Sequence, residues 1–211
     1  MNYKKAFKYF FEISIVKTVY LNYKCFNLKT CLKLPILIHK GTKIKSIGII
    51  SISCPASPGL IIFGKNCKIN NTGNLIFNGK ARIGPESHIF IDKSATLSFG
   101  SNFAATEGLK INCAKRVTIG SDCLFSWGIQ IIDTDFHKII TQEIIVNENK
   151  DILIGNHIWL GFNTTILKGT TVTNNVIVGA HSLLNKVYNE EYVVYAGNPA
   201  KVVKREVSWD Y

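Results

Sequence analysis

Two aspartates and a histidine stand close together in the stretch "IIDTDFHKII", residues 131–140. A neutral imidazole near pH 7 can take a proton from a weak nucleophile such as a hydroxyl group. Asp133 and Asp135 precede His137 by four and two residues, so a carboxylate is at hand to orient the ring and stabilise its cation. The alternative is an Asx-type turn without chemistry. The stretch predicts His137 as a general base, with Asp133 or Asp135 as its partner.

The C-terminal half of the chain repeats with a period of six residues. Every sixth residue from Ile154 is a branched aliphatic, and the fifth position of each unit is mostly small or β-branched. Such a repeat is typical of short strands that turn and stack into coils, where only the neighbouring coils complete the core. The first column holds Ile154, Leu160, Ile166, Val172, Val178 and Leu184, and the second holds Ile158, Thr164, Thr170, Val176, Ser182 and Tyr188.

The same period recurs upstream in shorter blocks separated by phase slips. A sandwich or barrel is the alternative fold, but its strands alternate with a period of two. The aliphatic or aromatic column contains Phe63, Ile69, Leu75, Ile83, Ile89, Ile91, Leu97, Phe103, Leu109, Ile119, Phe125 and Ile131. The fifth positions hold Cys67, Gly73, Gly79, Ser87, Ala95, Ser101, Cys113 and Cys123, so that three cysteines are predicted to be small core residues.

The repeat is interrupted once in the C-terminal half, between Ile131 and Ile154. A stack of coils accommodates extra residues only as a loop on one face, and such loops often carry function. We expect a loop over 137–153, with His137 at its mouth. The predicted domain is a parallel β-helix over 41–187, preceded by a basic, partly helical extension over 1–40 and followed by a tail over 188–211.

The repeats in "ILIGNHIWLGFNTTILKGTTVTNNVIVGAHSLLNKV", followed by "VVYAGNPAKVVK", resemble those of the hexapeptide-repeat acyltransferases. The resemblance covers about residues 60–204 and is strongest to the O-acetyltransferases that act on sugars, including those of surface-polysaccharide pathways. It implies a mainly β, left-handed parallel β-helix with an N-terminal helical extension and one expelled loop. It also implies His137 as general base and a homotrimer with active sites between neighbouring prisms.

The resemblance assigns further residues to acetyl-CoA, the acyl donor, and to the acceptor. Trp159 matches a tryptophan near the thioester and the acceptor, and Ala180 matches a backbone contact to the pantetheine arm. The remaining donor positions are Gly161, Asn185, Lys186, Lys201 and Lys204. Thr106 stands where these enzymes often carry an acceptor-binding asparagine, with Glu107 beside it. Asn102 or Asn112 is an alternative for that role.

The N-terminal extension carries most of the positive charge. Residues 1–45 hold ten lysines and one acid, Glu12, which gives 10 − 1 = +9 of the net charge of +11. Helical spacing groups Ala6, Tyr9, Phe10, Ile13, Val16 and Tyr20 on one side, which predicts an amphipathic helix packed on the body of the protein. A solvated arm, an acidic membrane surface, an anionic sugar polymer and a partner protein are the open interpretations of the charge, whereas no signature of a nucleic-acid-binding fold is present.

The six cysteines form no C-x-x-C pair, and a basic start interrupted by Lys8, Glu12 and Lys17 is a poor signal peptide. We therefore expect reduced thiols in a cytoplasmic protein, with the inner face of the membrane as an alternative site of action. The histidines lack the spacing of a zinc site, so no metal is expected. The predicted activity is acetyl transfer from acetyl-CoA to a hydroxyl of a sugar or of a capsule or O-antigen intermediate. N-acetylation of a nucleotide-linked amino sugar and a non-catalytic scaffold are the alternatives.

Overall fold

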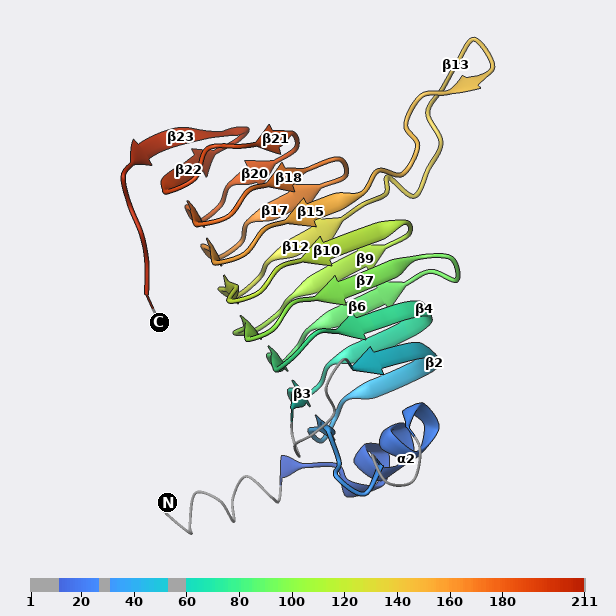
Figure 1. The fold of residues 1–211 in the computed structure, drawn as a ribbon. Helices are drawn as coiled ribbons and strands as arrows, with labels where there is room; N and C mark the ends of the chain where they lie inside the picture. The colour runs from blue at the N-terminus through green and yellow to red at the C-terminus, as the bar shows by residue number, and fades with distance from the viewer. Residues whose placement is uncertain (1–11, 27–30, 53–59, 211) are drawn as a thin grey trace.

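The computed structural model describes residues 12–26, 31–52 and 60–210. Within them the chain winds into a stack of coils, each built from three short strands, and the stack rises steadily toward the C-terminal end (Figure 1). Strands of consecutive coils pair in parallel, as the period-six repeat predicts. The predicted mainly β, left-handed parallel β-helix is confirmed.

The three strands of each coil form the three faces of a prism, numbered in chain order. Face 1 consists of β1 (Ile36–Ile38), β3 (Ile61–Phe63), β5 (Ala81–Ile83), β8 (Phe103–Ala105), β11 (Leu124–Phe125), β16 (Ile158–Leu160), β19 (Val176–Val178), β22 (Val193–Gly197) and β23 (Ala200–Arg205). Face 2 contains β6 (His88–Ile91), β9 (Lys110–Cys113), β12 (Gln130–Ile132), β17 (Thr165–Leu167) and β20 (Leu183–Leu184). Face 3 contains β7 (Thr96–Phe99), β10 (Arg116–Ile119), β15 (Ile152–Ile154), β18 (Thr171–Val172) and β21 (Val187–Tyr188). The long strands β2 (Lys43–Ile52) and β4 (Lys68–Phe77) pair along both faces 2 and 3.

Coil length explains the phase slips of the repeat. Trp159 pairs with Ile177, which is three units of the repeat further along the chain, whereas His88 pairs with Lys110 across a longer coil. In the upstream coils the face 2 strands are longer and bury an additional inward residue, such as Cys113 beyond Ile111.

The longer coils also displace one predicted core residue. The prediction that Ser101 is a buried fifth-position residue is wrong. Ser101 is exposed because it lies in the turn before β8, next to Asn102 in the left-handed backbone region.

Both columns of the C-terminal repeat face the core. All twelve side chains from Ile154 to Tyr188 in these columns are buried, and so are Cys67, Cys113 and Cys123. Burial raises the pKa of the Cys113 and Cys123 thiols to about 12, so both stay protonated at neutral pH. The prediction that these cysteines serve as small core residues is confirmed.

Helix α2 (Ile15–Cys25) covers the N-terminal end of the prism (Figure 1). The Asn22 amide donates to the Ile36 carbonyl and accepts from the Ile36 N–H, and the Thr18 hydroxyl accepts from the Ile38 N–H. The helix thereby satisfies the open edge of β1, which would otherwise be available to another strand.

The packing side of this helix differs from the predicted one. Val16 and Tyr20 are 80% and 52% exposed, and the buried residues are Thr18, Leu21 and Asn22. The orientation of the helix is therefore set by its hydrogen bonds to the edge strand and not by burial of its apolar side. The other part of the predicted helix, residues 1–11, lies outside the described residues. In the part of the chain that is described, no helix is long and apolar enough to cross a membrane.

The C-terminal end is closed by the antiparallel pair β22 and β23. The segment that follows returns along face 1, where the Trp209 ring stacks on His157 with 4.6 Å between centroids. Ladder pairing therefore extends from Ile36 to Arg205, on both sides of the predicted boundaries at 41 and 187. Whether those boundaries delimit independently folding units stays a prediction.

Candidate active site

The expelled loop leaves the prism where faces 2 and 3 meet. Leu124 pairs with Trp159 and Trp159 pairs with Ile177, so the coil that contains the loop is much longer than the regular coil that follows it. The loop runs from Asp133 to Asp151 and projects from the prism (Figure 1). Its outer part is the hairpin of β13 (Ile140–Thr141) and β14 (Ile144–Ile145). We call residues 133–151, with the turns at Lys168 and Lys186 in the following coils, the loop corner.

Asp133 fixes the start of the loop. It is fully buried in the inward column that contains Cys113 one coil below, and its carboxylate accepts the backbone N–H groups of Ala114 and Lys115 at 2.6 and 2.8 Å. These two bonds compensate the burial of the charge. Asp133 thus holds the coil open at the point where the chain leaves it.

Asp135 belongs to a polar cluster that holds the next turn of the loop. Its Oδ2 accepts from Lys168 Nζ at 2.6 Å and from the Asn147 amide at 2.8 Å. Asn147 also donates to the His137 carbonyl at 2.8 Å, and the His137 N–H donates to the Asp135 carbonyl at 2.7 Å. The hydrogen bond from Lys168 holds the pKa of Asp135 below its usual range, with Asn147 adding to it. The cluster therefore fixes the backbone of His137 from both sides.

His137 lines a cavity of about 500 Å³ at the loop corner. Phe136 before it adopts a left-handed backbone (φ 61°), an uncommon conformation for a bulky residue that often marks a functional turn. The wall opposite the loop comes from two lower coils and includes Phe90, Asp92 and Asn112. The cavity combines an imidazole, an amide and carboxylates, which suits a polar acceptor group.

The structure brings together only part of the predicted catalytic set. His137 and Asp135 share the cavity, but within the described residues no hydrogen bond joins the imidazole to Asp133 or Asp135. The orienting role of either aspartate stays a prediction. Sequence reasoning missed Asn147 and Lys168, which hold the loop. The single signal for Asn147 was its place inside the interruption of the repeat.

A second group of predicted residues gathers where faces 1 and 2 meet. Strand registers place Thr106, Ser126, Gly161, Gly179 and Ala196 at the same position of consecutive coils, and we call this column, with Ala180, the tight corner. A Cβ on Gly161 would lie 2.6 Å from the Ala180 nitrogen and 2.8 Å from the Val178 oxygen. The coils therefore stack with their backbones almost in contact.

Other residues that are predicted to bind acetyl-CoA lie along this corner and on the adjoining part of face 1. Trp159, Ile177, Val194 and Lys204 occupy one outward column, so Trp159 and Lys204 lie three strand spacings, roughly 14 Å, apart. Lys201 pairs with Ala196 at the top of the tight corner. Trp159 is 38% exposed, and its indole N–H donates to Ser126 at 3.4 Å. Glu107 lies in the turn beside Thr106.

The remaining two donor residues lie on the other side of face 2. Asn185 and Lys186 follow β20 at the loop corner, and Lys186 occupies the position that Lys168 holds one coil below. The predicted site is thus divided between two corners of the prism, with the whole of face 2 between them.

Comparison with known proteins gives this arrangement a family. The chain is 36% identical over 160 residues to the polysialic acid O-acetyltransferase of Neisseria meningitidis, a match that covers 71% of this chain and 74% of the relative. It is 28% identical to a putative lipopolysaccharide biosynthesis O-acetyl transferase of Escherichia coli K12, over 68% of this chain and 82% of the relative. A solved structure of the polysialic acid O-acetyltransferase OatWY matches at a TM-score of 0.60 and 30% identity, covering 84% of both chains. No family model matches the chain.

The chain belongs to the hexapeptide-repeat acetyltransferases. The predicted resemblance is confirmed, and a non-catalytic scaffold is disfavoured because the relatives are enzymes. Among residues 12–26, 31–52 and 60–210, no three His, Cys, Asp or Glu side chains gather in a way that could hold a metal ion.

Proposed function

We propose that the protein transfers an acetyl group from acetyl-CoA to a hydroxyl of a surface-polysaccharide intermediate, such as one of capsule or O-antigen. The observation that carries the proposal is the position of His137, exposed in a cavity at the mouth of the expelled loop. The relatives support it, since two of them are named as polysaccharide or lipopolysaccharide O-acetyltransferases. Asn112 lines the same cavity and is our candidate for holding the acceptor within one chain. Thr106 and Glu107, at the tight corner, remain candidates for a site that a neighbouring copy completes.

In the proposed reaction, His137 takes the proton of the acceptor hydroxyl as its oxygen attacks the thioester carbonyl. A carbon–oxygen bond forms, the carbon–sulfur bond breaks, and the proton passes from the imidazolium to the departing thiolate. Asn147 and Lys168 position His137 through the backbone of the loop, which keeps the imidazole in reach of both substrates. Acetyl-CoA would supply the activated acetyl group.

The donor-binding residues fit a long ligand with an anionic end. Trp159 is partly exposed beside the closely stacked tight corner, while Lys201 and Lys204 supply charge suited to phosphates higher on the same face. Because face 2 separates Trp159 from His137 in one chain, we propose that the tight corner of one copy meets the loop corner of a neighbour in a closed trimer.

The surface of the loop supports such an assembly. Phe136, Ile139, Ile140 and Ile144 are all more than half exposed, and exposed apolar side chains on a projecting hairpin mark an interaction site. Replacing Ile140 and Ile144 by serine should shift the protein from trimer toward monomer in light scattering. A trimer that persists unchanged would remove the loop from the interface.

His137→Ala and the nearly isosteric His137→Gln test the proposed base. Both should lower turnover with labelled acetyl-CoA by roughly 10²–10⁴-fold, with the unfolding temperature and the size of the assembly unchanged. Near wild-type transfer in either variant would refute the assignment. A parallel screen of sugar hydroxyl and amino-sugar acceptors separates O-acetylation from N-acetylation of a nucleotide-linked sugar.

We also propose that the enzyme works in the cytoplasm, in contact with the inner face of the membrane. The described cysteines are all free thiols, which fits a reducing compartment. The exposed side of α2 combines Val16, Tyr20 and Tyr23 with Lys24, a composition suited to an anionic lipid surface. Flotation with anionic but not zwitterionic vesicles should recover the protein, and substituting Val16 and Tyr20 with serine should abolish this.

A further inference from the structure

A second cavity lies directly below the His137 cavity on face 2. It measures about 490 Å³ and shares Phe90 and Asn112 with the His137 cavity, so the two adjoin, and we call them together the groove on face 2. Four lysines line it, Lys43, Lys45, Lys68 and Lys110, together with His88. Among the described residues that line this part of the groove there is no aspartate or glutamate.

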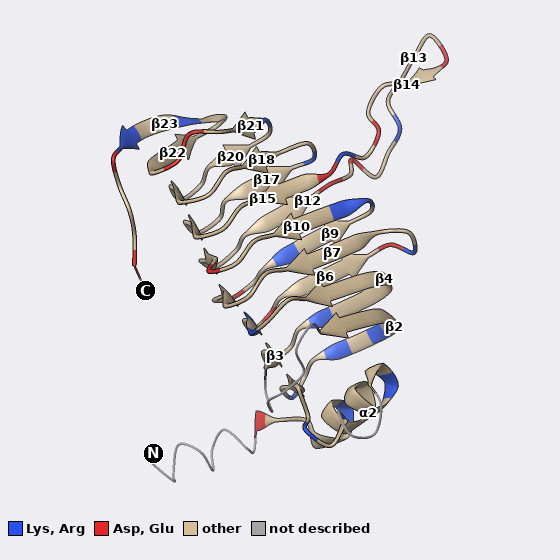
Figure 2. Ribbon diagram, in the orientation of Figure 1, with Lys and Arg blue, Asp and Glu red and all other residues tan. Residues whose placement is uncertain are grey.

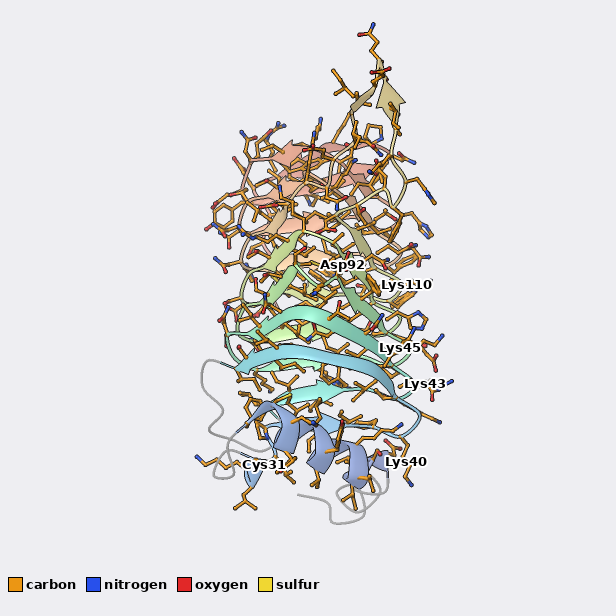
Figure 3. All side chains as sticks on the ribbon, turned by 90° about the vertical axis from the view of Figure 1, so that its right-hand side faces the viewer. Cys31, Lys40, Lys43, Lys45, Asp92 and Lys110 are labelled. Carbon is orange, nitrogen blue, oxygen red and sulfur yellow. The ribbon has the colours of Figure 1, made fainter. Side chains whose placement is uncertain are left out.

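The cationic side chains are aligned by the strand register. Lys43 pairs with Lys68, Lys68 with His88, and His88 with Lys110, so one basic residue stands at the same position of four stacked strands. Adjacent strands lie about 4.8 Å apart, which makes the column roughly 14 Å long. Figure 2 shows blue segments on β2 and on strands stacked above it, and Figure 3 shows Lys43, Lys45 and Lys110 on the same side of the prism. We call Lys43, Lys68, His88 and Lys110 the basic column.

Folding alone does not explain this column. Like charges at directly opposed positions of neighbouring strands destabilise a sheet. His88 reflects the strain, because burial together with Lys68 and Lys110 lowers its pKa, while Glu86 in the preceding turn acts in the opposite direction. The three lysines are exposed, and none of them forms an ion pair with another described residue. A polyanion in the groove would turn the repulsion into attraction.

The column beside the cations carries groups that suit a sugar. Asn70, Phe90 and Asn112 occupy successive paired positions one step further along face 2. The amides can pair with hydroxyl groups, and the Phe90 ring, 37% exposed, offers a flat apolar surface for a sugar ring. This second column connects the basic column with the His137 cavity, because Phe90 and Asn112 line both cavities.

We propose that the groove on face 2 binds an extended acidic glycan, with carboxylates of successive sugars on the basic column and the reacting sugar in the His137 cavity. The proposal rests on the proposed acetyl transfer and adds the chemical class of the acceptor: a chain of several acidic sugars. Contacts along the groove would keep the glycan bound while one of its hydroxyl groups reaches His137.

Binding is measured first, without turnover, using fluorescently labelled polysialic acid as the probe. The triple variant Lys43→Gln, Lys68→Gln and Lys110→Gln should bind at least about tenfold more weakly than wild type, and wild-type binding should weaken steeply with salt. The control Lys33→Gln, Lys80→Gln and Arg82→Gln removes three positive charges from exposed positions outside the groove. It should bind like wild type, and neutral dextran should not bind.

Turnover then separates this proposal from the catalytic one. The groove variant should lose kcat/KM for polysialic acid at least about tenfold while the KM for acetyl-CoA stays unchanged. His137→Ala should bind the polymer like wild type without acetylating it, so a failure of the catalytic proposal leaves the binding result intact. Equal binding by the groove and control variants, dextran binding, a raised KM for acetyl-CoA instead, or tighter binding of duplex DNA through the same lysines would each overturn the proposal.

Discussion

The two corners that bound face 2 are built in opposite ways. At the tight corner, Gly161 and Ala180 stack so closely that a methyl group on Gly161 would meet backbone atoms of the next coil. At the loop corner, the chain leaves the prism for a long insertion and holds it with a few hydrogen bonds to Asp133, Asn147 and Lys168. Rigid stacking at one corner and an anchored insertion at the other allow the prism to be regular and still present the His137 imidazole outside it.

The difference assigns separate duties to the two corners. The partly exposed Trp159 beside the tight corner suits the proposed binding of a long acyl donor, whereas the loop corner carries the His137 imidazole and adjoins the proposed acceptor groove. Changes at the tight corner should therefore act on stability and donor binding. Changes at the loop corner should act on turnover and acceptor binding.

The strongest change should be in stability at the tight corner. Gly161→Ala should lower the free energy of unfolding by roughly 3 kcal/mol, because its Cβ meets backbone of the next strand that cannot move aside. Gly169→Ala, next to the loop corner, meets only the flexible Lys150 side chain and should cost about 1 kcal/mol for its left-handed backbone. Thermal unfolding of both variants measures the contrast, and equal losses would show that the corners do not differ in packing.

A smaller effect is expected when the loop anchor is removed. Lys168→Met leaves Asp135 and Asn147 without their shared donor and should lower kcat about tenfold while the KM for acetyl-CoA is kept. Lys168→Arg should recover part of the loss, which a general loss of stability would not explain. The lowered pKa of Asp135 means that the ion pair is present above the ordinary carboxyl range and is lost only as pH falls through that lowered value. The anchor should thus be constant through neutral pH.

The weakest of these effects concerns pH and the acceptor groove. The cationic form of His88 is disfavoured by burial and by Lys68 and Lys110, and an acidic glycan would favour it again, so binding should take up a proton. Affinity for polysialic acid should therefore rise a few-fold as pH falls from about 8 toward 6. His88→Gln should remove this dependence while keeping binding at the higher pH. A pH profile that is the same in both proteins would exclude His88 from the groove.

The period-six repeat predicted the stack, both core columns and the place of the loop, because inward positions are set by local strand geometry and neighbouring coils. The position of Ser101 was mispredicted because coil length varies where face 2 strands are longer. The predicted orientation of the helix was wrong because Thr18 and Asn22 form hydrogen bonds with the edge strand β1, and no sequence pattern shows that this strand is an edge.

The candidate site was predictable in its residues more than in its arrangement. His137 followed from the interruption of the repeat, but Lys168 and Lys110 look like ordinary surface lysines in the sequence. Asp135 and Lys168 lie on different coils, and so do the members of the basic column. In both cases only the strand register brings the residues together. The division of the site between two corners follows from the same register.

Mixed assemblies of the proposed trimer test whether one active site combines the loop corner of one copy with the tight corner of another. His137→Ala and Trp159→Ala protein, each expected to be nearly inactive at low acetyl-CoA, would be unfolded together, refolded at equal ratio and assayed. A shared site predicts recovery of about a quarter of the wild-type sites, since each interface has an even chance of receiving each intact corner. Activity no higher than that of the separately refolded variants would contradict a shared site and place all of the chemistry within one chain.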